Sequence, residues 1–416
     1  MRSGFTWWII AAVMLLLDFY VYQAVKTISH NLSPFAKTII QFAYWGITIA
    51  ALASLLSLPY IQALQTNKIF RNYVFAIFVG LFFAKLVGSA FFLGDDLRRL
   101  VTWMILKLAP QKEVITTTQP SAGISRSVFL SWMGVGVGSS LFGTLLYGFS
   151  NKYNYKIKRT SLAFSNLPKA FKGLKIVHIS DIHSGSFNDK AAVNLGIDLI
   201  LKEKADIILF TGDLVNDRHD EMHEYKDIFN RLNAPMGVYS TLGNHDYGDY
   251  ASWPSEVAKN QNLESLKQLQ KAMGWRLLMN EHIIFEREGE MIALLGIENF
   301  GVKGRFPKYG RMQDAYPGTE NIPFKILMSH DPSHWDYQIT KEYKDIDLML
   351  SGHTHGMQFG LDNPYIKWSP VQWMYKQWAG LYEEGKQKLY VNRGFGFIGY
   401  PGRVGIMPEI TVITLV

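Results

Sequence analysis

The residues of this chain that could do chemistry gather at the ends of short aliphatic runs in its second half. A polar motif ends each of five such runs, which are residues 175–179, 207–210, 237–242, 324–328 and 346–350. The side chains at these ends are Asp181, His183, Asp213, Asn244, His245, Asp246, His330, His353 and His355. Carboxylates, imidazoles and an amide oxygen are ligands for hard to borderline divalent metal ions. The 416 residues include no cysteine, so thiolate ligands are excluded and oxygen and imidazole must hold any metal.

The spacing within two of the motifs supports metal binding. Asp181 and His183 are two residues apart at a strand end, so both side chains project to the same side and can hold one ion. His353 and His355 repeat this spacing. Each motif is weak by itself, because a lone histidine at a strand end is more often structural than a ligand. Five motifs in order at strand ends indicate a single site for a pair of divalent ions.

The elements that must position these side chains follow from the same runs. Four to six aliphatic residues bounded by Gly, Ser and Asp predict buried strands. Helical patterns at 190–204 and 255–273 lie between them, so we expect an α/β domain of sheets covered by helices. In such sheets functional groups gather beyond the carboxyl ends of the strands.

The first 150 residues have a different composition. Each of four apolar stretches, at 5–25, 39–64, 73–93 and 128–149, has about the 20 residues needed to cross a bilayer. They predict a unit of four transmembrane helices. Residues 100–108 are too few to cross and predict an interfacial helix, followed by a loop that includes the polar run 116–121. We therefore expect a transmembrane unit at 1–150, a basic juxtamembrane linker at 151–165 and a catalytic domain at 166–416.

The charges of the chain say less about its setting. The net charge of +7 does not predict nucleic-acid binding, because many basic residues flank the apolar stretches. We expect a multi-pass protein of the cell membrane. The basic residues divide evenly between the two sides of the membrane, so they do not fix its orientation. Only the basic cluster after the last stretch weakly favours a catalytic domain on the cytoplasmic side. Asp18 and Lys85 fall inside the apolar stretches. They would either form a functional pair within the membrane, or the Lys85 side chain would extend to the membrane interface.

The order of the motifs resembles a known superfamily. Asp-x-His, Gly-Asp, Gly-Asn-His-Asp, His and Gly-His-Thr-His occur in the order seen in the calcineurin-like metallophosphoesterases. Residues 167–185 and 390–415 are similar to the bacterial membrane-associated branch, and the resemblance covers roughly residues 160–416. It implies a calcineurin-like β-sandwich flanked by helices.

The resemblance also implies a role for each site residue. One metal ion would be held by Asp181, His183, Asp213 and His355, and the other by Asp213, Asn244, His330 and His353. Asp213 would bridge two ions about 3.5–4 Å apart. His245 would stabilise the transition state or protonate the leaving oxygen, and Asp246 would orient its imidazole. The branch often has Gly-Gly-Gln after the paired histidines, whereas this chain has Gly-Met-Gln, which places Met357 at the rim of the site.

The expected function is hydrolysis of a phosphomonoester, phosphodiester or diphosphate by metal-activated hydroxide. Mixed oxygen and imidazole ligands favour Mn, with Fe or Zn as alternatives. Tethering to the bilayer favours a lipid-linked substrate. The basic and aromatic segment 365–382 would either dip into the headgroup layer or hold an acyl chain, or else merely pack over the sheet. The alternatives are a hydrolase of soluble phosphoesters whose membrane unit serves tethering or sensing, and a non-catalytic membrane sensor.

Overall fold

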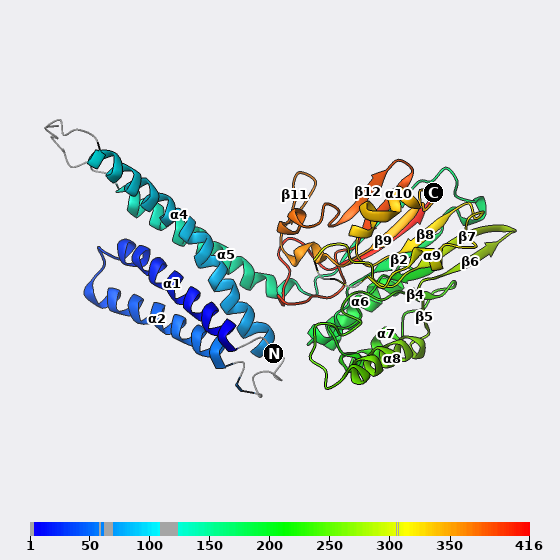
Figure 1. Cartoon of the computed structure of the whole chain (residues 1–416), viewed down its shortest axis with the longest axis horizontal. Coiled ribbons are helices and arrows are strands. Elements are labelled where there is room, and N and C mark those ends of the chain that lie inside the picture. The colour runs from blue at the N-terminus through cyan, green and yellow to red at the C-terminus, as the bar shows by residue number, and fades with distance from the viewer. Residues whose placement is uncertain (1–3, 58–59, 62–69, 109–123, 305, 307) are drawn as a thin grey trace. The chain divides into compact units, whose positions relative to one another are not determined.

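Two units make up the chain in the computed structural model, which describes residues 4–57, 60–61, 70–108, 124–304, 306 and 308–416 (Figure 1). The first unit is Met1–Tyr147 and the second is Gly148–Val416. The polar run 116–121 lies outside the described residues.

The first unit contains four helices that are long and apolar enough to cross a membrane. They are α1 (Gly4–Ile28), α2 (Pro34–Ser57), α4 (Phe75–Leu108) and α5 (Arg126–Gly148). This confirms the predicted transmembrane unit and makes the chain a membrane protein.

The separate interfacial helix predicted at 100–108 is wrong, because α4 continues without a break to Leu108. The polar residues in its middle have partners on neighbouring helices. Asp95 accepts a hydrogen bond from Ser127 of α5 at 2.6 Å, and Asp96 accepts one from Tyr20 of α1 at 2.9 Å. Since these carboxylates are satisfied inside the helical unit, they do not end the helix.

The two charges inside the spans pair with each other. Lys85 of α4 forms an ion pair with Asp18 of α1, so Lys85 does not reach toward the interface. The hydroxyl of Tyr44, on α2, donates to the main-chain oxygen of Asp18 at 2.8 Å, and its ring centroid lies 4.9 Å from the Lys85 ammonium. Pairing lowers the cost of placing two charges at membrane depth and joins three helices.

The second unit is a sandwich of two six-stranded mixed sheets. The first sheet has the order β1 (Lys156–Leu162), β14 (Glu409–Leu415), β2 (Lys175–Ile179), β3 (Ile207–Phe210), β4 (Val238–Ser240) and β5 (Trp275–Leu277). The second has the order β12 (Gly380–Glu384), β13 (Gln387–Val391), β9 (Leu348–Ser351), β8 (Lys325–Met328), β7 (Glu290–Gly296) and β6 (Glu281–Arg287). Strands β2 to β5 are parallel, as are β7, β8, β9 and β13. The five predicted strands are present as β2, β3, β4, β8 and β9.

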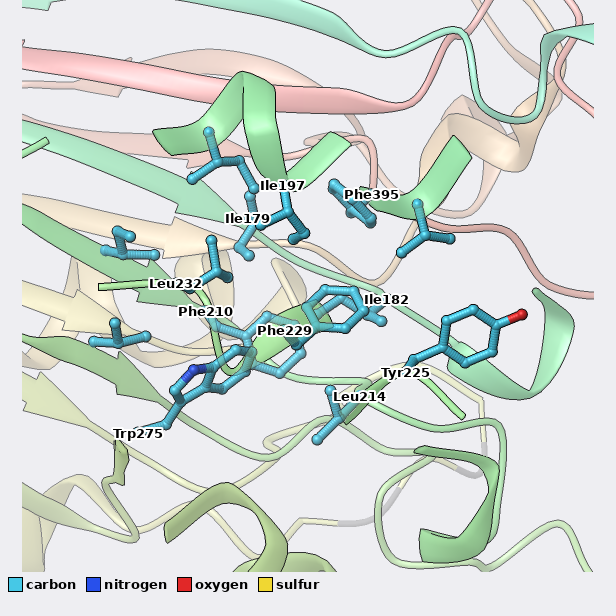
Figure 2. Close-up of a cluster of buried hydrophobic side chains, with 14 of the residues drawn as sticks. Ile179, Ile182, Ile197, Phe210, Leu214, Tyr225, Phe229, Leu232, Trp275 and Phe395 are labelled. Carbon is cyan, nitrogen blue, oxygen red and sulfur yellow. The ribbon is translucent and has the colours of Figure 1, made fainter. Parts of the chain in front are cut away.

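Three apolar layers hold the sandwich together. Alternate residues of the strands, such as Ile176, Leu209, Leu294 and Leu350, fill the space between the sheets. On the outer face of the first sheet, α6 (Lys190–Lys202), α7 (Lys226–Phe229) and α8 (Glu256–Ala272) pack against the opposite side chains, as Figure 2 shows for part of this cluster. The second sheet is covered by α9 (Met312–Ala315) and by the helical turn Trp335–Ile339. The structure confirms the predicted β-sandwich flanked by helices.

The expected linker at 151–165 differs in the structure, because it contains β1. This strand lies at the edge of the first sheet and pairs with β14 in parallel register. Its exposed basic residues are typical of an edge strand. Because they interrupt the aliphatic residues, the sequence does not show the apolar run that predicts a strand. Tyr155, directly before β1, stacks on Phe395 with ring centroids 4.5 Å apart, so the catalytic unit begins before this residue.

Candidate metal centre

The predicted metal ligands occupy the turns that follow β2, β3, β4, β8 and β9. Five of them have left-handed backbones, with φ of 53° at Asp181, 48° at His183, 61° at Asp213, 71° at His353 and 51° at His355. This conformation costs a non-glycine residue about 1–2 kcal/mol and clusters at functional sites. Main-chain hydrogen bonds between the turns maintain it. The N–H of Asp181 donates to the carbonyl of Gly212 at 2.9 Å, and the N–H of His183 donates to the main-chain carbonyl of Asp213 at 3.1 Å. The turns therefore aim these side chains inward at an energetic cost.

Asp181, His183 and His355 form a first group that could hold a metal ion, with ligand atoms within 4.8 Å of one another. All three are buried, and Nε2 of His355 lies 3.3 Å from Oδ1 of Asp181. Burial holds the pKa of His183 well below its usual value. The imidazole is therefore neutral and keeps a lone pair for a cation.

Asp213, His330 and His353 form a second group of the same kind. Nε2 of His330 lies 3.1 Å from Oδ2 of Asp213, and its Nδ1–H donates to the Thr211 carbonyl at 2.7 Å. Oδ1 of Asn244 lies 2.8 Å from Nδ1 of His353, at the edge of this group. Burial acts to lower the pKa of His330, but the charge of Asp213 outweighs it and raises that pKa to about 10. The surroundings therefore favour a positive charge at this position.

One carboxylate faces both groups. Oδ2 of Asp213 lies 3.5 Å from Nε2 of His183, in the first group, and 3.1 Å from Nε2 of His330, in the second. A carboxylate in this position can serve a ligand in each group at once. The structure thus brings all seven predicted ligands, Asp213 among them, together at one site.

The buried donor atoms of the site are suited to binding metal ions, because hydrogen bonds do not satisfy all of them. Within the described residues, both ring nitrogens of His183 are buried and make no hydrogen bond. A buried polar atom left unsatisfied costs about 1–3 kcal/mol. Divalent ions bound between the groups would satisfy these nitrogens and balance the two central aspartates.

His245 and Asp246 differ from each other in their surroundings. Nδ1–H of His245 donates to the main-chain oxygen of Asn216 at 2.7 Å, and its ring lies edge-on to His183 at 4.9 Å between centroids. The Asp246 carboxylate instead accepts main-chain N–H groups of Asp213 at 2.9 Å and of Leu214 at 2.8 Å. Burial and the charge of Asp213 raise the pKa of Asp246 to about 7.

The expectation that Asp246 orients His245 is therefore wrong: a backbone carbonyl orients the imidazole, and Asp246 holds the turn that carries Asp213. Asp246 is next to His245 in the sequence, but the turns at the strand ends leave main-chain N–H groups that need an acceptor. The Asp246 carboxylate accepts from these groups instead of from His245.

Two further residues were missed by sequence reasoning. The Tyr375 hydroxyl lies 2.8 Å from Nε2 of His353 and donates to Asp331 at 3.4 Å. Burial and the charge of Asp331 raise the pKa of Tyr375, so the hydroxyl keeps its proton. If Nδ1 of His353 served as the metal ligand, Nε2 would carry the imidazole proton and would donate it to the Tyr375 hydroxyl. Asp331 adjoins a predicted ligand and could have been suspected, whereas Tyr375 lies in the aromatic segment and has no local signal.

Comparisons with known proteins agree with this geometry. Residues 174–357 match the family described as "Calcineurin-like phosphoesterase", and residues 1–152 match "Probable Calcineurin-like phosphoesterase, transmembrane domain". An uncharacterized metallophosphoesterase of Bacillus subtilis, YkuE, is 31% identical over 60% of this chain and 82% of its own length. A "Transmembrane protein with metallophosphoesterase domain" of Danio rerio is 28% identical over 62% of this chain and 57% of its own length. Among solved structures, the NAD nucleotidase NadN of Haemophilus influenzae matches 57% of this chain and 49% of its own, at 19% identity and a TM-score of 0.38.

The fold, the paired Asp and His groups and the family matches define a metal-dependent phosphoester hydrolase. The chain belongs to the calcineurin-like phosphoesterase family and joins that domain to four membrane-spanning helices.

Substitution of Tyr375 tests its contact with His353. Tyr375→Phe removes the hydroxyl that fixes the imidazole, and we expect the affinity for one of two metal ions to fall by about 10–100-fold. Titration calorimetry with Mn²⁺ measures this loss. Tyr365→Phe makes the same chemical change at an exposed position of the same segment and should leave both affinities unchanged. Equal affinities in the two variants would show that Tyr375 does not position the ligand.

Proposed function

We propose that this chain hydrolyses a phosphomonoester, phosphodiester or diphosphate with two divalent metal ions. One ion would be held by Asp181, His183, Asp213 and His355, and the other by Asp213, Asn244, His330 and His353. The position of the Asp213 carboxylate between the two groups carries this proposal. Imidazole and oxygen donors together favour Mn, with Fe or Zn as alternatives.

The chain's own residues would divide the remaining work. When bound, two such ions supply an activated water and neutralise the phosphate. His245 would donate a proton from Nε2–H to the leaving oxygen, while its Nδ1–H, held by the main-chain oxygen of Asn216, fixes the ring. Proton donation of this kind contributes about 10²–10⁴ in rate. Asp246 would act indirectly, by holding the turn of Asp213.

The substrate proposed is lipid-linked. The support is the chain's own membrane unit, which keeps the site near the bilayer, where a lipid substrate is concentrated. A hydrolase of soluble phosphoesters, with the helices serving tethering or sensing, is the alternative. The basic residues that follow α5, at 152, 156, 158 and 159, favour a catalytic domain on the cytoplasmic side.

Substitution of the central carboxylate tests the two-ion proposal. Asp213→Asn should abolish hydrolysis and reduce bound metal to one ion or none, because a neutral amide cannot serve both groups. Elemental analysis of the purified chain measures the stoichiometry. Asp227→Asn, at an exposed position of α7, is the matched control. Two bound ions with unchanged turnover in Asp213→Asn would refute its assignment as the bridge.

The role of His245 predicts a dependence on the leaving group. His245→Ala should keep both ions while turnover drops about 10²-fold or more, since the loss falls on protonation of the leaving oxygen. Nitrophenyl esters, whose leaving groups need no proton, should lose less than alkyl esters. Asp246→Asn should instead weaken metal binding and affect both ester classes alike. Equal losses across leaving groups in His245→Ala would exclude it as the proton donor.

Removal of the membrane unit tests the lipid-linked substrate. A chain starting at Gly148 retains Tyr155 and β1 and should hydrolyse soluble esters at the rate of the full chain. Activity on a phospholipid embedded in vesicles should fall by about 10²-fold, because tethering no longer raises the local concentration. Kinetics of both substrates on both chains, at equal metal loading, give the comparison. The same ratio of vesicle to soluble activity in the two chains would favour a soluble phosphoester.

A further inference from the structure

A small hairpin carries an unusual group of exposed apolar side chains. It consists of β10 (Leu361–Asp362), β11 (Lys367–Trp368) and the 3-10 helix Pro370–Trp373, and β11 stands apart from the two main sheets in Figure 1. Tyr365, at its tip, is 94% exposed, and Trp373 is 75% exposed. We call the whole group the apolar tip; its members are Met357, Leu361, Tyr365, Ile366, Trp373 and Met374.

The apolar tip rests on an ordered base. Leu361 pairs with Trp368 across the hairpin, and the Trp368 ring lies edge-on to Trp373 at 6.2 Å between centroids. Beneath them Trp378 is buried with Val371, so Trp378 belongs to the core rather than to the surface. The hairpin is thus a fixed platform whose outward side chains have no apolar cover in the described part of the chain. Scattered exposed apolar residues are ordinary, but a group of them on one short stretch of chain indicates an interaction site.

The apolar tip also adjoins residues of the metal centre along the chain. It begins at Met357, two residues after His355, and ends at Met374, directly before Tyr375, whose hydroxyl lies 2.8 Å from His353. The backbone of Met357 is left-handed, with φ of 54°, where glycine would be free of strain. An exposed methionine at a position suited to glycine adds apolar surface at the edge of the site.

The chemistry of the hairpin fits a lipid surface. Tyrosine and tryptophan place their rings at the headgroup level of a bilayer, and methionine, leucine and isoleucine fill the acyl boundary. Lys376 is exposed beside them and suits anionic headgroups. The one carboxylate of the hairpin, Asp362, is neutralised by Arg393 at 2.8 Å.

The helices of the chain itself place a bilayer close to the second unit. Helix α5 ends at Gly148 and β1 begins at Lys156. The residues between them span at most about 25 Å, at ~3.5 Å per residue. A catalytic domain on so short a connection works next to the membrane that holds its own helices.

We propose that the apolar tip docks on the bilayer that holds the chain's own helices and so holds the metal centre close to that membrane surface. The occupant is the lipid bilayer, with acyl chains meeting Tyr365 and Trp373 and anionic headgroups meeting Lys376. The proposal concerns docking alone, and it stands even if the substrate is soluble.

The absence of cysteine allows a direct test, because each introduced cysteine is the only one to react. Tyr365→Cys and Trp373→Cys, in the full chain, are labelled with an environment-sensitive fluorophore and reconstituted into phosphatidylcholine and phosphatidylglycerol vesicles. Val257→Cys is the matched control, since Val257 is 78% exposed on α8, which lies away from β11 in Figure 1. Each labelled variant should hydrolyse a soluble ester at the rate of the unlabelled original chain, which shows that it is folded.

We expect the labels at 365 and 373 to shift to the blue in vesicles and to lose emission when brominated acyl chains replace ordinary ones. The label at 257 should do neither. Emission at 365 and 373 that matches the control would overturn the proposal. A blue shift that brominated lipid does not quench, and that grows with the protein-to-lipid ratio, would also overturn it, because a second copy of the chain would then cover the apolar tip. Should Trp373→Cys disturb its packing on Trp368, Tyr365→Cys still decides the outcome, since its side chain is almost wholly exposed.

Discussion

The carboxylate of Asp213 contacts motifs that are far apart in the chain, and the geometry of the site depends on it. Oδ1 accepts the main-chain N–H of His245 at 2.8 Å, while Oδ2 faces His183 and His330. The turns around it leave no spare room. A Cβ at Gly243 would lie 2.2 Å from Oδ1 of Asp213, and one at Gly212 would lie 2.3 Å from the Gly243 nitrogen. Glycine at both positions lets two strand ends approach one central carboxylate.

The site is expensive to build, and the sandwich stabilises it. Left-handed backbones at the ligands and the unsatisfied buried imidazole of His183 both raise the free energy of the folded chain. The apolar layers between and outside the sheets hold the strand ends in register, and hydrogen bonds such as Gly396 N–H to Asp181 at 2.8 Å fix the turns from outside. Metal ions would then gain a preformed set of donors, which is the arrangement a hydrolytic centre needs.

Much of the fold and the site could be predicted from the sequence because the signals are local. Continuous aliphatic runs predicted β2 and β3 to the residue, and the motifs at their ends predicted a common site that the structure brings together. What the sequence could not supply depends on contacts between distant residues. Tyr375 reaches His353 across the fold, and Asp246 meets main-chain groups of a neighbouring turn rather than the adjacent histidine. Helix α4 continues through Asp95 because Ser127, on another helix, satisfies it.

A paired metal centre around Asp213 is the central claim, and the magnetic interaction of its ions tests it most directly. Mn²⁺ is added stepwise to the metal-free full chain, and the electron paramagnetic resonance spectrum is recorded at each step. Two Mn²⁺ ions about 3.5–4 Å apart and sharing a carboxylate are coupled, so the second equivalent should produce a multiline spectrum of a spin-coupled pair. Hydrolysis should rise with that spectrum. If saturation with Mn²⁺ gives only the six-line spectrum of isolated ions, the two groups do not form one dinuclear centre and the account is contradicted.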